Sequence, residues 1–281
     1  MRIGAVNLWS WYPVVASGDL QAGAVMPAML HGERLVVWRS REGRIGVWND
    51  RCPHRSMSLS LGATTGDALV CPYHGWEFGS DGNCRRIPAH PALTPSRAAR
   101  ARVYPAIEAA NYVWACLGEP ASAQPEYGLF AGLVPEPIRS MHVRADAETV
   151  ALVLLSHPFA AERGPAELAD CRLDGDILAV THAGERGHTL CRARLGLPSI
   201  VVCQPDPASG SLPYAALVQP TGEDTAAIHL ALLGSGTPAA RLALNSALVR
   251  LRHRMGDLAQ SALLLKLRNA AAGWAQPAPM M

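Results

Sequence analysis

Two short segments, each with a cysteine and a histidine close together, constrain this 281-residue chain more than any other feature. The first is Cys52-Pro53-His54-Arg55, and the second is Cys71-Pro72-Tyr73-His74-Gly75-Trp76, with 16 residues between His54 and Cys71. Proline and glycine beside the cysteines and histidines are typical of tight loops. The fold must therefore bring two loops together so that they present two thiols and two imidazoles.

This set of side chains is the one that a Rieske 2Fe-2S cluster requires. In such a cluster two thiolates bind one iron and two imidazoles bind the other, so each loop supplies one ligand of each kind. The predicted ligands are Cys52, His54, Cys71 and His74. Neutral imidazoles reduce the negative charge on the cluster, which predicts a reduction potential of roughly −150 to +300 mV and a role in accepting electrons. The alternative is a structural zinc site, but zinc motifs place like ligands together, whereas cysteine and histidine alternate here.

The residues around the two loops have the pattern of an antiparallel sheet. Short β-like runs at 35–38 and 45–48 flank a turn and predict a hairpin, and residues 112–117 predict a later strand. The segment 118–137 is rich in proline, glycine and alanine, as domain boundaries often are. We therefore expect an all-β domain at residues 1–119 and a second domain at residues 120–281.

The second domain combines strand-like runs with a helical C-terminus. Strand-like runs at 200–203 and 226–230 come first, so the predicted fold class is α+β. Thr237 is a candidate N-cap because Pro238 follows it at the first helical position. A long amphipathic helix is predicted from apolar residues that recur at steps of three and four, namely Leu244, Leu248, Leu251, Met255 and Leu258. The tail after Gly273 is expected to fray.

Composition and motifs exclude several classes of function. The formal net charge is +2 and Lys266 is the only lysine among 25 basic residues, so no basic stripe predicts nucleic-acid binding. No run of about 20 apolar residues could span a membrane, and the first residues lack the regions of a signal peptide. Seven cysteines, an odd number, suit a reducing compartment, so we expect a cytoplasmic protein. Without a dinucleotide fingerprint or a P-loop, the chain should take its electrons from a partner protein.

The first domain resembles the Rieske domain of the Rieske non-heme iron oxygenases, in particular their monooxygenase and O-demethylase branch. The resemblance rests on residues 52–62, 71–82, 11–14 and 113–120, and so covers the whole domain. It implies a second domain of the helix-grip fold, in which two histidines and one carboxylate hold a mononuclear Fe(II). It also implies a homotrimer, a ferredoxin or flavin reductase as electron donor, and hydroxylation or demethylation of a small organic substrate with O2.

The second domain matches the iron motif of this family only in part. Residues 150–159 resemble the histidine segment, with His157 as the first histidine, and Asp257 on the predicted long helix matches the carboxylate ligand. However, Glu162 stands where the second histidine is expected, and Leu154 where the family has a bridging aspartate. The set His157, Glu162 and Asp257 still offers acceptable ligands to Fe(II), although one imidazole fewer should weaken the affinity. An apolar Leu154 cannot supply the hydrogen bond that couples cluster and iron histidines across subunits.

Two functions therefore stay open. The chain is either an oxygenase component with a modified mononuclear iron, or a Rieske electron-transfer or partner subunit whose second domain has lost its iron. Simpler interpretations exist for each residue: His157 bonded to a backbone group, Glu162 paired with Arg163, and Asp257 paired with His253. The other histidines lack ligand spacing and are interpreted as structural, namely His31, His90, His142, His182, His188 and His229.

Overall fold

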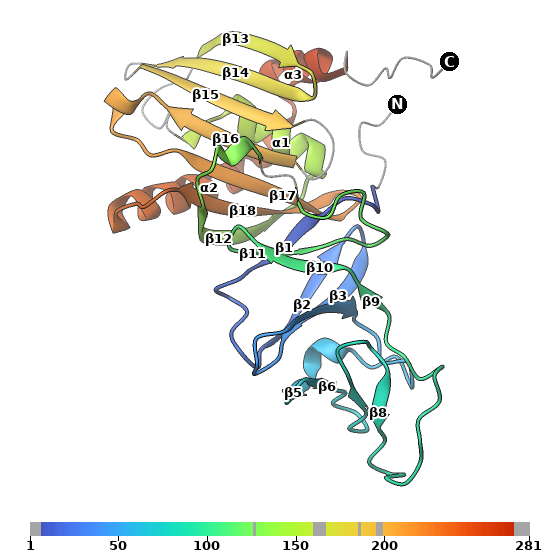
Figure 1. Cartoon of the computed structure of the whole chain (residues 1–281). Helices are drawn as coiled ribbons and strands as arrows, with labels where there is room; N and C mark the ends of the chain where they lie inside the picture. The colour runs from blue at the N-terminus through green and yellow to red at the C-terminus, as the bar shows by residue number, and fades with distance from the viewer. Residues whose placement is uncertain (1–6, 126–127, 160–166, 185–186, 195–198, 273–281) are drawn as a thin grey trace. The chain divides into compact units, whose positions relative to one another are not determined.

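The structure of the chain is a computed structural model, which describes residues 7–125, 128–159, 167–184, 187–194 and 199–272 (Figure 1). The chain divides into two compact units, and each unit is described by itself. The first unit is Leu8–Pro125, and the second consists of the residues from Glu126 onward together with Asn7. The boundary predicted at residues 119 and 120 lies a few residues before this division. Glu162 and the tail after Gly273 lie outside the described residues.

Three antiparallel sheets form the first unit, as expected for an all-β domain. The first has the order β1-β11-β10, with bounds Tyr12–Ala16, Tyr112–Ala115 and Ala106–Ala109. The second has the order β2-β3-β4-β9, with bounds Val25–Leu30, Glu33–Arg39, Ile45–Asn49 and Val103–Tyr104. The third has the order β5-β6-β7-β8, with bounds Ala63–Thr65, Ala68–Val70, Glu77–Phe78 and Cys84–Arg86. A short 3-10 helix, η1 (Leu59–Leu61), precedes β5.

The predicted hairpin is confirmed as β3 and β4, which pair antiparallel in the second sheet. Trp38 and Trp48 project from these strands and are fully buried, with ring centroids 5.0 Å apart in an edge-to-face arrangement that aromatic pairs favour. Gly46 lies opposite Trp38, and any side chain there would overlap the indole ring. The hairpin is therefore part of the core on which the two cysteine loops rest.

A single antiparallel sheet of seven strands dominates the second unit (Figure 1). Its order is β12-β18-β17-β16-β15-β14-β13. From β12 to β18 in chain order, the bounds are Pro135–Val143, Glu167–Asp174, Ile177–Gly184, Gly187–Arg194, Ser199–Pro205, Tyr214–Gly222 and Thr225–Leu233. The helices are α1 (Ala147–Ser156), α2 (Pro238–Ala259) and α3 (Ala262–Ala272), with 3-10 helices η2 (Gly128–Phe130) and η4 (Pro207–Ser209). The three helices share one hydrophobic core with the sheet, which confirms the α+β prediction.

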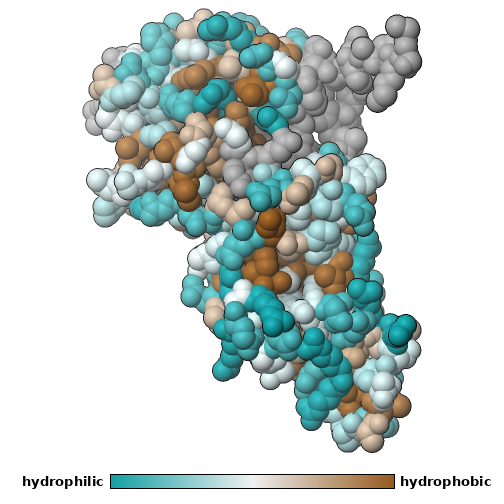
Figure 2. All heavy atoms as spheres, viewed as in Figure 1, coloured by the Kyte–Doolittle hydropathy of each residue, from teal (hydrophilic) through white to brown (hydrophobic). Residues whose placement is uncertain are grey.

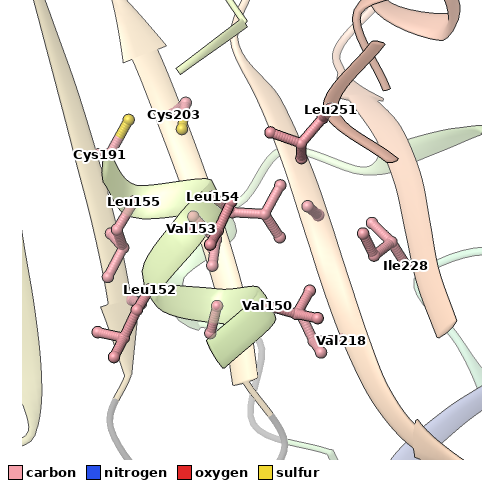
Figure 3. Close-up of a cluster of buried hydrophobic side chains, with 14 of the residues drawn as sticks. Val150, Leu152, Val153, Leu154, Leu155, Cys191, Cys203, Val218, Ile228 and Leu251 are labelled. Atoms are coloured by element: carbon pink, nitrogen blue, oxygen red, sulfur yellow. The ribbon is translucent and has the colours of Figure 1, made fainter. Parts of the chain in front are cut away.

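The helix α1 is the apolar centre of this unit. Asp146 caps its start, because its carboxylate accepts hydrogen bonds from Thr149 N (2.9 Å) and Thr149 Oγ1 (2.7 Å). Every residue of α1 except Glu148 is buried. Figure 3 shows the helix lying against the sheet and α2, with Val150, Leu152, Val153, Leu154 and Leu155 among Cys191, Cys203, Val218, Ile228 and Leu251.

The predicted long helix is confirmed as α2. Thr237 Oγ1 accepts a hydrogen bond from Ala240 N at 3.2 Å, and Pro238 occupies the first turn, where its missing N–H costs nothing. All five predicted apolar positions are buried, namely Leu244, Leu248, Leu251, Met255 and Leu258. After α2 ends, α3 packs against α1, and Arg268 donates a hydrogen bond to Thr149 Oγ1 at 2.6 Å.

The surface is mixed in character. On the face drawn in Figure 2, hydrophobic side chains lie in small groups among hydrophilic ones. Within the residues that the structure describes, no helix is both long enough and apolar enough to cross a membrane.

Candidate metal centres

The first cysteine loop follows β4 and is closed by hydrogen bonds within its own backbone. Cys52 N donates to Met57 O at 2.8 Å, and Ser56 N donates to Cys52 O at 2.8 Å. Ser56 has a φ of +55°, a left-handed conformation that is uncommon for residues other than glycine. These bonds make a tight turn that holds His54 at its tip.

The second loop joins β6 to β7 and repeats the same pattern. Cys71 N donates to Trp76 O at 2.9 Å, and Gly75 N donates to Cys71 O at 3.1 Å. Gly75, at the position equivalent to Ser56, has a φ of +67°. A Cβ atom on Gly75 would also lie only 3.1 Å from Pro88 Cγ. The two loops therefore have the same backbone conformation, with each histidine two or three residues after its cysteine.

The two cysteines lie on the inner side of the loops. Cys52 and Cys71 are each 3% exposed and belong to the hydrophobic core of the unit. The pKa of the Cys52 thiol is raised to about 11, mainly by burial and also by the neighbouring Cys71, while the backbone N–H groups of His54 and Arg55 act in the opposite direction. Such a thiol becomes a thiolate when a metal supplies the compensating positive charge.

The two histidines lie on the outer side. His54 and His74 are exposed, and their ring centroids are 4.8 Å apart. The indole of Trp76 stacks on His54 at 4.4 Å with an interplanar angle of 6°, and Tyr73 contacts His74 at 3.8 Å between centroids. These aromatic contacts restrict the orientation of both imidazoles.

The four side chains form two pairs, a buried thiol pair and an exposed imidazole pair. Nowhere in the described part of the chain do three histidine, cysteine, aspartate or glutamate side chains gather where a single metal ion could bind. A structural zinc ion needs four ligands around one point, whereas a Rieske cluster needs a thiolate pair on one iron and an imidazole pair on the other. A buried thiol pair and an exposed imidazole pair fit the cluster.

A buried aspartate supports the first loop, and the sequence analysis missed it. Asp50 is 2% exposed and lies two residues before Cys52. Its carboxylate accepts hydrogen bonds from Ser60 N (2.6 Å) and Ser60 Oγ (2.9 Å), and Arg34 lies 3.4 Å away. Asp50 thus ties the start of the loop to η1. An acidic residue shortly after a predicted strand and two residues before a ligand was the available signal.

In the second unit, His157 and Asp257 belong to no group of three or more possible metal ligands among the described residues. His157 is the C-cap of α1 and is half-buried, whereas Asp257 is an exposed residue of α2. Leu154 is 1% exposed and packs in the core among side chains from the sheet and from α2 (Figure 3). Since Glu162 is outside the described residues, ligation by His157, Glu162 and Asp257 stays a prediction.

Comparison with known proteins identifies the first unit. Residues 10–105 match the family of Rieske 2Fe-2S domains. The oxidoreductase NdmD of Pseudomonas putida is 40% identical over 111 residues, which are 39% of this chain and 19% of NdmD. The oxygenase component of chloroacetanilide N-alkylformylase from Rhizorhabdus wittichii is 35% identical over 144 residues, which are 50% of this chain and 40% of that protein. This chain therefore spans less than half the length of these two relatives.

Solved structures extend the likeness to both units. NdmA of Pseudomonas putida CBB5 has a TM-score of 0.72 at 19% identity, covering 95% of this chain and 89% of NdmA. Dicamba monooxygenase bound to dicamba has a TM-score of 0.72 at 18% identity, covering 98% of this chain and 93% of that enzyme. At this identity the likeness concerns the fold. Residues 10–105 thus belong to the Rieske 2Fe-2S domains, and the chain as a whole is similar in fold to NdmA and dicamba monooxygenase.

Proposed function

We propose that the chain is the oxygenase component of a multicomponent system, which takes electrons from a ferredoxin or flavin reductase and hydroxylates or demethylates a small organic substrate with O2. The main observation in support is the pair of equivalent loops, with buried thiols on one side and exposed imidazoles on the other. The shared fold of NdmA and dicamba monooxygenase supports a role for the second domain in the same system.

The four residues of the loops have distinct tasks in this proposal. Cys52 and Cys71 would hold one iron, and His54 and His74 the other. The bound cluster supplies one-electron transfer. Because the two imidazoles are exposed, a donor protein can approach them directly, while the buried thiols are kept from water and oxidants. Stacking by Trp76 keeps the His54 ring in one orientation for that approach.

The second domain would contribute the substrate site and the mononuclear iron. A homotrimer is part of the proposal, since in this family electrons cross between subunits. Light scattering at micromolar concentration should then return the mass of three chains. A monomer would contradict this assembly and favour the second candidate function.

The second candidate is an electron-transfer or partner subunit without a mononuclear iron. One observation favours it: Leu154, where the family has a bridging aspartate, is buried in the apolar core of α1. A leucine there cannot accept the hydrogen bond that would couple the two metal centres.

Metal analysis of anaerobically reconstituted protein separates the two candidates. An oxygenase component should contain about three irons and two acid-labile sulfides per chain, and an electron carrier about two of each. Substrate oxidation with a ferredoxin and its reductase then tests the reaction itself. About one zinc and no sulfide per chain would refute both candidates, because the loops would then form a structural zinc site.

A further inference from the structure

The exposed side of the two cysteine loops carries positive charge. Arg51 and Arg55 belong to the first loop, and both side chains are exposed. Arg51 Nη2 donates a hydrogen bond to Ser56 Oγ at 3.1 Å, which holds its guanidinium against the loop. The sequence has no aspartate or glutamate at residues 51–57 or 71–76, so nothing within the loops offsets the two charges.

The acidic side chains that border the loops are neutralised by other arginines. Asp50, just before the first loop, is buried and lies 3.4 Å from Arg34. Glu77, directly after the second loop, pairs with Arg86 at 2.6 Å between Oε1 and Nη1. The charges of the two loop arginines therefore remain available to a molecule that approaches from outside.

The part of the sequence around the loops is also basic as a whole. Residues 51–102 contain seven arginines and three acidic residues, a net charge of +4. Because the whole chain has a net charge of +2, the remaining residues together carry −2. A concentration of one sign of charge on a surface attracts partners of the opposite sign and speeds their association.

Apolar side chains flank both imidazoles in the same loops. Pro53 precedes His54, Pro72 follows Cys71, and both prolines are exposed. Tyr73 is 59% exposed, and its ring centroid lies 3.8 Å from that of His74. Apolar and aromatic side chains together with arginines are typical of surfaces where proteins bind one another.

We propose that Arg51, Pro53, Arg55, Pro72 and Tyr73 form a docking surface for an acidic electron-transfer protein, a plant-type ferredoxin with carboxylates around its own cluster. We call these five residues the loop surface. The inference rests on the proposed function in one respect, namely that the loops hold the Rieske cluster. Charge complementarity is the reason for choosing an acidic partner.

The loop surface is small, since it comes from two short loops. Small interfaces are typical of transient redox encounters, in which attraction between charges raises the association rate more than the affinity. In the encounter one electron passes from the ferredoxin, which is oxidised, to the cluster held by the loops, which is reduced, and no bond forms or breaks. The transfer is downhill, because plant-type ferredoxins have lower reduction potentials than Rieske clusters.

Reduction kinetics test the loop surface. The oxidised protein, with its cluster in place, is mixed with excess reduced plant-type ferredoxin at an ionic strength of about 0.1 M. Electron paramagnetic resonance of freeze-quenched samples then follows the reduced Rieske cluster. Arg51→Glu and Arg55→Glu should each lower the second-order rate constant by about tenfold or more, because each places a negative charge where the carboxylates of the ferredoxin approach.

Arg41→Glu is the matched control. It makes the same change of charge in the same unit, on an exposed residue of the turn that precedes β4, whereas the first loop follows β4. The five residues of β4 span roughly 16 Å at about 3.3 Å each, which exceeds the Debye length of about 10 Å. The rate constant of this variant should stay within about twofold of the wild-type value.

The salt dependence of the wild type keeps the test valid if the loop variants lose their cluster. Raising the ionic strength to about 0.5 M should lower the wild-type rate constant by about tenfold, because salt screens the attraction. A rate constant that does not fall with salt, or one that is equal in the wild type and in both loop variants, would overturn the docking surface. Loop variants that change the mass in light scattering but not the rate would also overturn it, because the arginines would then join copies of this chain.

The outcomes also separate this inference from the proposed function. Substrate oxidation that depends on ferredoxin, at a rate that neither loop variant changes, would retain the oxygenase proposal and reject the docking surface. Reduction that both loop substitutions slow, in a protein that oxidises no substrate, would retain the docking surface and reject the oxygenase proposal.

Discussion

The two candidate centres differ in how the chain assembles them. In the first unit each half of the site is a loop of a few residues, closed by its own backbone, with cysteine and histidine next to each other in sequence. In the second unit the predicted ligands His157 and Asp257 come from separate elements, the end of α1 and α2, which pack in one apolar core with the sheet.

This difference predicts that the two centres tolerate sequence change differently. A loop motif loses its function when a ligand changes, because no other residue lies near enough to substitute. A site that lies between packed elements has side chains of several elements nearby. The following predictions test this contrast.

The largest effect should come from the loops themselves. Either Cys52→Ser or His74→Ala should abolish the brown colour, the iron and the acid-labile sulfide of the first unit, because each removes a ligand with no replacement. Visible absorption and chemical analysis measure the loss. Cys84→Ser is the matched control, since Cys84 is a buried thiol of the same core. A variant of Cys52 that still binds the full cluster would contradict the assignment.

The second largest effect should be on the stability of the second unit, through the packing of its core. Leu154→Ala should reduce the free energy of unfolding by about 3 kcal/mol, because it leaves a cavity beside α1. Urea unfolding followed by circular dichroism measures this loss, while the absorption of the cluster should stay the same. As a control, Leu242→Ala replaces an exposed leucine of α2 and should change stability by less than about 0.5 kcal/mol. Equal losses in the two variants would mean that α1 is not the centre of the core.

A smaller effect is expected at the support of the first loop. Asp50→Ala removes the acceptor for Ser60 N and Ser60 Oγ and should cost about 2 kcal/mol of unfolding free energy. The variant should also lose its cluster faster in the presence of a chelator, which is followed by the decay of visible absorption. Asp67→Ala, which removes a partly exposed ion pair with Arg85, should have a much smaller effect on both. If both variants lose the cluster at the wild-type rate, Asp50 does not support the loop.

The smallest effects test the equivalence of the two loops. Gly75→Ala places a Cβ atom in the left-handed region and near Pro88, and should cost about 1–2 kcal/mol. Ser56→Gly, at the equivalent position, should change stability by less than about 1 kcal/mol, because glycine already prefers this conformation. Thermal unfolding of the first unit compares the two. Similar destabilisation by both substitutions would show that the loops differ in backbone conformation.

Local sequence patterns predicted those parts of the molecule that local interactions determine. The hairpin of β3 and β4, the cap at Thr237 and the buried positions of α2 depend on neighbouring residues, and each was predicted correctly. Asp50 was missed because its partner Ser60 lies beyond the loop. The hydrogen bond between His182 and Leu155 O was not predicted, because it depends on which strand lies under α1, and no spacing in the sequence encodes that.

The matching backbone hydrogen bonds of the two cysteine loops bear on the order of events when the protein matures. Since Cys52 and Cys71 each bond to the backbone of their own loop, the loop shape is fixed by the chain and not by its ligand side chains. Little conformational entropy then remains to be lost when iron and sulfide arrive. The two loops should therefore fold before the cluster is inserted. A protein that delivers the cluster would then bind loops that are already folded.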